Sequence, residues 1–180
     1  MKKIFIFILL AASLCSLAAM AQAPYVAENA PLDQPFTTNA TEANRIETAS
    51  KPYIDKARQS YPQAKKRFLA GLPPKHSLFV TISLRDRTGN YEQAFIAVQK
   101  IEGGNITGRI WNDIAVVSGY KFGDRYTFPE SELIDWLITH PDGTEEGNFV
   151  GKFLDEYQKT NKASQWGTAP NRQKTAPSSR

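Results

Sequence analysis

The chain has 180 residues, with 22 basic and 18 acidic side chains, so its net charge is +4 when histidine is neutral. An excess this small, without a concentrated basic segment in the predicted domain, argues against a nucleic-acid-binding protein. Cys15 is the single cysteine, so an intramolecular disulfide is excluded, and a thiolate metal site is excluded as well if Cys15 is removed with the N-terminal segment.

The first 21 residues have the three zones of a secretory signal peptide. Lys2 and Lys3 precede an apolar run from Ile4 to Ala19, and small residues flank Met20. The run is too short for a comfortable membrane span, which needs about 20 apolar residues. We therefore expect cleavage after Ala21, with an uncleaved N-terminal anchor as the alternative. Removing 21 of the 180 residues leaves 159, in a periplasmic or secreted protein with no cysteine and no stable membrane span.

The two ends of the mature chain lack apolar periodicity. Residues 22–40 contain three prolines and are predicted to form a flexible linker. Residues 160–180 contain no acidic side chain and are rich in Ser, Thr, Asn and Gln, which predicts a basic disordered tail. Between them, residues 41–159 are enough for one domain with its own core.

The segment 41–72 is predicted to be helical. Apolar residues recur there at spacings of three and four, which gives one apolar stripe: Ile54, Ala57, Tyr61, Ala64 and Phe68. Pro62 has no N–H and crowds the preceding turn of a helix. We therefore expect a kink, or two short helices, near Tyr61.

The middle of the chain changes to the period of two that is typical of strands. Strands are predicted over 78–85, 92–102, 105–112 and 125–128. Gly103-Gly104 between the second and third strands is a hairpin signal. The segment 133–139 is ambiguous, but the alternation of Ile134, Trp136 and Ile138 favours a strand, with Trp136 buried against the helical stripe.

A terminal helix is predicted over 149–157. The expected fold class is therefore α+β. An N-terminal helix, or a kinked helix pair, packs on a small, mostly antiparallel sheet of four to five strands, and a C-terminal helix follows.

Short segments between residues 95 and 149 carry a resemblance: Phe95-Ile96-Ala97-Val98, Gly108-Arg109-Ile110-Trp111-Asn112, Gly123-Asp124, Ile134-Asp135-Trp136-Leu137 and Gly147-Asn148-Phe149. At this spacing they resemble the bacterial domain of unknown function family 2314, the YegJ-like family. The most specific part is Asp135-Trp136 following Gly123-Asp124. The resemblance covers roughly residues 53–157, and it implies a small α+β domain of bacterial source and no assigned activity.

Residues suited to catalysis or metal binding are few. His76 and His140 lie beside prolines in predicted loops without neighbouring ligand residues, so we expect two exposed histidines, no metal site and no cofactor. A hydrolase would need two facing carboxylates, for which Asp124 and Asp135 are the candidates. In the competing interpretation, Asp124 stabilises a turn, Asp135 points outward beside buried Trp136, and the neighbouring acids, Glu130 and Glu132, face solvent.

Aromatic residues are concentrated between residues 111 and 128. The candidate binding residues are Trp111, Tyr120, Phe122 and Tyr126, although such density is more often part of a core. Our first hypothesis is an exported, non-catalytic binding or interaction protein of the bacterial envelope, whose partner is an unknown protein or envelope component. The alternative is an envelope hydrolase that uses paired carboxylates. A third possibility is that the basic tail holds the protein against anionic envelope polymers at low salt.

Overall fold

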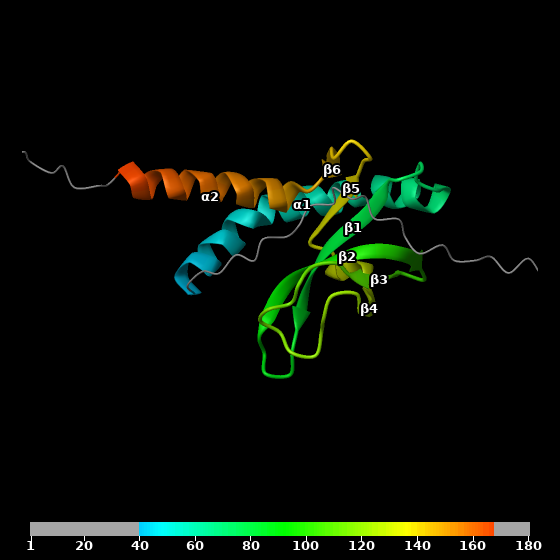
Figure 1. Ribbon diagram of the computed structural model, residues 1–180, viewed down its shortest axis with the longest axis horizontal. Helices are drawn as coiled ribbons and strands as arrows, with labels where there is room; N and C mark the ends of the chain where they lie inside the picture. The colour runs from blue at the N-terminus through cyan, green and yellow to red at the C-terminus, as the bar shows by residue number, and fades with distance from the viewer. Residues whose placement is uncertain (1–39, 168–180) are drawn as a thin grey trace, which may run out of the picture.

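The computed structural model describes residues 40–167, which form two α-helices, a short 3-10 helix and one six-stranded sheet (Figure 1). The predicted signal peptide, Cys15, residues 22–39 of the predicted linker and the tail beyond Gly167 lie outside the described residues. The elements in chain order are α1 (Ala40–Ala70), β1 (Ser77–Arg85), β2 (Tyr91–Glu102), β3 (Asn105–Ile110), β4 (Arg125–Pro129), η1 (Glu130–Glu132), β5 (Asp135–Thr139), β6 (Glu145–Gly147) and α2 (Phe149–Gly167). The α+β class predicted from the sequence is confirmed.

The strands lie in the order β4-β3-β2-β1-β5-β6, and every neighbouring pair is antiparallel. The hairpin between β2 and β3 turns at Gly103 and Gly104, whose φ angles are 56° and 77°. Both angles fall in the left-handed region that favours glycine, which explains the Gly-Gly signal. The strand that the sequence did not predict is β6. Its three residues, Glu-Glu-Gly, contain no apolar alternation.

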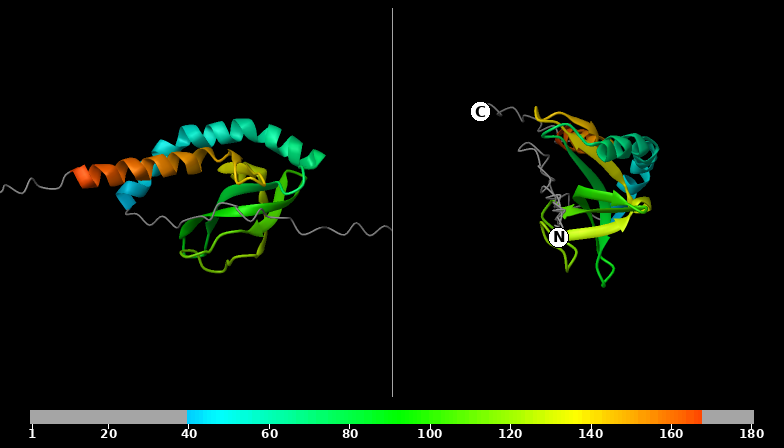
Figure 2. Two further views of the ribbon diagram at one scale, coloured as in Figure 1. Left: turned by 45° about the horizontal axis from the view of Figure 1, so that its top comes forward. Right: turned by 90° about the vertical axis from the view of Figure 1, so that its right-hand side faces the viewer.

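Helix α1 is continuous, so of the two alternatives expected near Tyr61, a kink or two short helices, the second is wrong. Pro52 and Pro62 both lie inside the helix, which curves along the sheet (Figure 2). A proline removes one backbone hydrogen bond. Ala57, Tyr61 and Ala64 are buried in the main core, and this packing on both sides of Pro62 offsets the loss.

One face of the sheet packs against α1 and forms the main core. The inward side chains of β1 are Leu78, Val80, Ile82 and Leu84, all buried. Trp136 on β5 lies in the same cluster, and its indole N–H donates to the carbonyl of Ala57 (3.0 Å) and to the hydroxyl of Ser60 (3.1 Å). The predicted burial of Trp136 against α1 is confirmed.

Gly147 allows β6 to approach Trp136 closely. Its φ is +76°, and a Cβ placed there would lie 2.3 Å from the carbonyl oxygen of Trp136 and 2.9 Å from the indole ring. Only a residue without a Cβ fits this position. Close packing against Trp136 therefore explains why a glycine begins the Gly147-Asn148-Phe149 segment.

Helix α2 runs past the predicted end at Tyr157 and continues to Gly167. It packs beside the first half of α1 (Figure 1). The rings of Tyr53 and Phe153 stack at 4.6 Å between centroids, and the Tyr157 hydroxyl donates to Glu42 at 2.6 Å. This packing against α1 stabilises a helix that the sequence pattern indicated only over its first half.

Candidate functional site

The four candidate aromatic residues divide between the two faces of the sheet. Tyr120 and Tyr126 pack against the main core, with ring centroids 5.7 Å apart. Trp111 packs on the opposite face against Phe79, and Phe122 lies 5.1 Å from the Trp111 ring. The structure therefore joins two of the four predicted residues in one surface.

We call Phe79, Phe95, Trp111 and Phe122 the aromatic face. Phe79 is buried, Phe95 and Trp111 are half-buried, and Phe122 is 52 % exposed. No described helix packs on this side of the sheet, since α1 and α2 both lie on the other side (Figure 2). Among the described residues, Phe122 and part of Trp111 therefore stay exposed on this face.

Trp111 is fixed in place although it lies just past the end of β3. Its backbone N–H donates to the carbonyl of Phe95 at 2.8 Å. The buried side chain of Asn112 accepts the N–H of Phe95 at 2.8 Å and donates to the carbonyl of Asp113 at 3.0 Å. The chain beyond β3 thus stays attached to β2, which holds the Trp111 backbone at the sheet.

The loop that carries Phe122 is held by two carboxylates. Glu92 accepts the backbone N–H groups of Ala115, Val116 and Val117 at 2.7–3.2 Å, and Asp86 accepts that of Ser118 at 3.2 Å. These partners are more than 20 residues apart in sequence, so no local pattern indicates them.

Asp86 also organises its own turn. The hydrogen bond from the Thr88 hydroxyl has the largest effect on the pKa of Asp86. Against an opposing desolvation effect, this bond and a weaker one from the backbone of Ser118 lower that pKa well below its ordinary value. The carboxylate is therefore ionised at neutral pH, the state in which it accepts the N–H of Ser118.

Asp124 and Asp135 both bind backbone N–H groups. Asp124 accepts the N–H of Lys121 at 3.1 Å, which agrees with its predicted turn role. Asp135 is only 2 % exposed, so the expectation that it points outward is wrong. Its carboxylate accepts the N–H of Trp136 at 2.8 Å and that of Val150 at 2.6 Å. It caps the start of α2, where backbone donors have no partner within the helix.

Burial raises the pKa of Asp135, and the hydrogen bonds from Val150 and Trp136 oppose that shift.

The two candidate acids, Asp124 and Asp135, are also far apart. Asp124 directly precedes β4, and Asp135 begins β5, with β3, β2 and β1 between these strands. Four strand spacings of about 4.8 Å place them roughly 19 Å apart across the sheet. The carboxyl groups of glycosidases are separated by about 5–9.5 Å, so these two do not face one another.

The neighbouring acids are also placed by the structure. Glu130 forms an ion pair with Lys65 at 2.7 Å and is half-buried, so the expectation that it faces solvent is wrong. Glu132 is exposed, as expected. Residue Lys65 lies on α1, far from Glu130 in sequence, so a charge pattern alone could not pair them.

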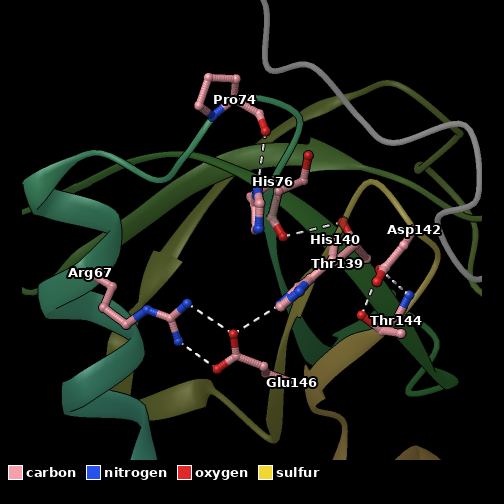
Figure 3. A network of polar contacts seen from close by, with 9 residues as sticks. Arg67, Pro74, His76, Thr139, His140, Asp142, Thr144 and Glu146 are labelled. Carbon is pink, nitrogen blue, oxygen red and sulfur yellow. Dashed lines mark hydrogen bonds and ion pairs between the residues drawn. The ribbon is translucent and has the colours of Figure 1, made fainter.

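The two histidines meet at one end of the sheet (Figure 3). Their ring centroids are 4.7 Å apart, and both residues are half-buried, so the prediction of two isolated, exposed histidines is wrong. The reason is strand register, because β1 pairs Ser77 with Thr139 and so brings His76 and His140 together. His140 also contacts Glu146 of β6, with 2.9 Å between Nε2 and Oε1.

Glu146 joins this histidine pair to α1 (Figure 3). The Arg67 guanidinium donates two hydrogen bonds to its carboxylate, at 2.5 and 2.9 Å. This contact, with a further contribution from His140, lowers the pKa of Glu146 to about 2. The cluster therefore attaches the end of α1 to the β5–β6 hairpin. Within residues 40–167, no group of three or more His, Cys, Asp or Glu side chains is arranged to hold a metal ion.

Comparison with known proteins gives one match. The family model of DUF2314, described as an uncharacterized protein conserved in bacteria, matches residues 44–168. The match spans every described strand and nearly all of both α-helices. No match was found among curated proteins or among solved structures. Neither described helix combines the length and the apolar character that crossing a membrane requires.

Proposed function

The chain belongs to the DUF2314 family, and we propose that it is an exported, non-catalytic binding protein of the bacterial envelope. Its partner, a protein or another envelope component, contacts the aromatic face. Export is supported by the signal-peptide pattern of residues 1–21. Binding is supported by one observation above all, the exposed Phe122 ring packed on half-buried Trp111.

Aromatic residues in this arrangement are suited to the centre of an interface. Phe and Trp supply large apolar areas, and a few such anchors carry most of the binding free energy in typical complexes. Glu92 accepts hydrogen bonds from backbone N–H groups of the loop that carries Phe122, and these order the loop before binding. A pre-ordered loop loses less conformational entropy when the partner binds.

A non-catalytic role is supported by what the candidate acids do. Asp124 and Asp135 both accept backbone N–H groups. Asp124 precedes β4 and Asp135 begins β5, and these two strands are four strand spacings apart across the sheet. Their geometry therefore gives no support to a mechanism in which these two carboxylates act together.

The test compares Phe122→Ala with Leu69→Ala, a matched control that is 58 % exposed on α1. The mature protein and both variants are used to capture partners from envelope extracts, and the captured components are quantified by mass spectrometry. A component captured by the wild type should fall about tenfold with Phe122→Ala, as expected for an interface anchor, and stay unchanged with Leu69→Ala. Equal capture by all three proteins would contradict the proposal.

Export has its own test. Mass spectrometry of the periplasmic or secreted fraction should find a protein that begins at Gln22. An intact Met1 in that fraction would show that the signal peptide is not cleaved there.

A further inference from the structure

A groove of about 560 Å³ lies between α1 and α2, on the helical side of the molecule. It is separate from the aromatic face, which lies on the other side of the sheet. Its volume is in the range of small-molecule sites, about 300–1,000 Å³. The lining residues are Tyr53, Lys56, Phe149, Lys152, Phe153 and Tyr157, with Glu156 and Thr160 at the C-terminal end.

Aromatic rings form the walls of this interhelical groove. Tyr53 and Phe153 stack at 4.6 Å between centroids with an angle of 21° between their planes, and Tyr157 follows 5.7 Å from Phe153. Tyr53 remains 38 % exposed although it is stacked. Flat, partly exposed rings of this kind offer an apolar surface on which an aromatic or alkyl group can pack.

The charge of the groove is concentrated at its Phe149 end. The ammonium of Lys56 lies 5.0 Å from the centre of the Phe149 ring, and no carboxylate among residues 40–167 forms an ion pair with it. Lys152 lies nearby in the same groove and is 3.6 Å from Glu145. The positive charge of Lys56 therefore has no ionic partner in the described part of the chain.

The N-terminus of α2 adds little to the attraction of anions by Lys56. Asp135 already accepts the N–H of Val150 there, so its negative charge offsets the helix terminus. At the other end of the groove, Glu156 is paired with Lys159 at 2.7 Å. Lys56 is thus the group that would select the charge of a ligand.

We propose that the interhelical groove binds a small amphipathic anion. Its aromatic or alkyl body packs along Tyr53 and Phe153, and its single carboxylate, sulfonate or phosphate group lies at Lys56. The proposal does not depend on the aromatic face or on its partner.

The experiment uses the mature protein and two fluorescent probes of nearly equal shape. 1-Anilinonaphthalene-8-sulfonate carries one anionic group, and N-phenyl-1-naphthylamine is its neutral analogue. Titrations at low salt should give saturable binding of both probes, with the anionic one bound more tightly. Lys56→Gln should weaken the binding of the anionic probe about three- to fivefold, the range expected for an exposed ionic contact. The affinity for the neutral probe should stay unchanged.

The matched control is Lys51→Gln, which removes an exposed lysine of α1 that does not line the groove. It should leave both affinities unchanged. Phe153→Ala should weaken both probes, with circular dichroism used to verify that it is folded. Phe122→Ala should have no effect, because it lies on the other face of the sheet.

Three results would overturn the proposal. The first is no saturable binding of the anionic probe. The second is an equal effect of Lys56→Gln and Lys51→Gln on that probe. The third is loss of binding with Phe122→Ala and not with a folded Phe153→Ala, which would assign the probe to the aromatic face.

Discussion

Trp136 and Trp111 lie against opposite faces of the same sheet and have different surroundings. Trp136 is 6 % exposed, contacts α1 and donates hydrogen bonds to Ala57 and Ser60. Trp111 is half-buried and packs on the other face, where its ring lies 6.4 Å from that of Phe79 and 5.1 Å from that of Phe122. The difference teaches that the helix covering a face, rather than the residue type, separates a core tryptophan from a partly exposed one.

The largest expected effect is on the covered face. Trp136→Ala should lower the free energy of unfolding by about 3–5 kcal/mol, because it removes a large buried side chain and its hydrogen bonds to α1. Urea denaturation measures this loss. Trp111→Ala should lower the free energy of unfolding by clearly less, since part of the Trp111 ring is already exposed to water. Equal losses in the two variants would show that the faces do not differ in this way.

Asp135 gives the next largest effect. Asp135→Ala leaves the N–H groups of Trp136 and Val150 without their acceptor and should cost about 1–3 kcal/mol. Asp135→Asn keeps one acceptor oxygen and should cost less. Denaturation at pH 7 compares the two with wild type. An unchanged midpoint in Asp135→Ala would show that the cap does not stabilise α2.

The raised pKa of Asp135 makes the stability of the fold depend on pH in a definite direction. The native protein binds this proton more tightly than the unfolded chain, so the resulting stability is complete below the unfolded pKa of about 4 and is lost as pH rises through the folded pKa.

Glu146 sharpens the comparison because its pKa is shifted in the opposite direction. With a folded pKa of about 2 against an ordinary value of 4.5, it contributes stability above pH 4.5 that is lost as pH falls toward 2. Its side chain is 39 % exposed, so solvent screening limits the contribution to less than about 1 kcal/mol. Glu146→Gln should therefore destabilise slightly at pH 7 and much less at pH 2. Glu102→Gln, in an exposed ion pair with Lys100, is the control.

Phe122→Ala should have the smallest effect on stability. Because Phe122 is 52 % exposed, the free energy of unfolding of the protein should change by no more than about 0.5 kcal/mol in this variant. Capture of the partner should nevertheless fall. A large loss of stability would show that Phe122 belongs to the core, and would remove the main support for the aromatic face.

Local patterns in the sequence predicted much of the fold. The strands β1 and β2, the Gly103-Gly104 turn and the apolar stripe of α1 were each predicted from residues close together in the chain, and each was confirmed. The family resemblance was confirmed as well, over residues 44–168. These features could be predicted because periodicity and turn geometry are set by the backbone within a few residues.

The candidate site was predicted only in part. Trp111 and Phe122 were identified as candidates from aromatic density, but nothing in that density indicates that Tyr120 and Tyr126 pack against the opposite face. The interhelical groove was missed, since its walls come from segments almost 100 residues apart. Neither feature has a local pattern, because both arise when distant segments pack together.

The sequence by itself therefore determined the element types, most strand positions, the fold class and the burial of Trp136. Tertiary structure decided that His76 meets His140, that Asp135 caps α2, and that α1 continues through Pro62. The physical reason is the same in each case. Strand register and helix packing bring together groups that are far apart in sequence, and the free energy of those contacts exceeds the local preference of a single residue.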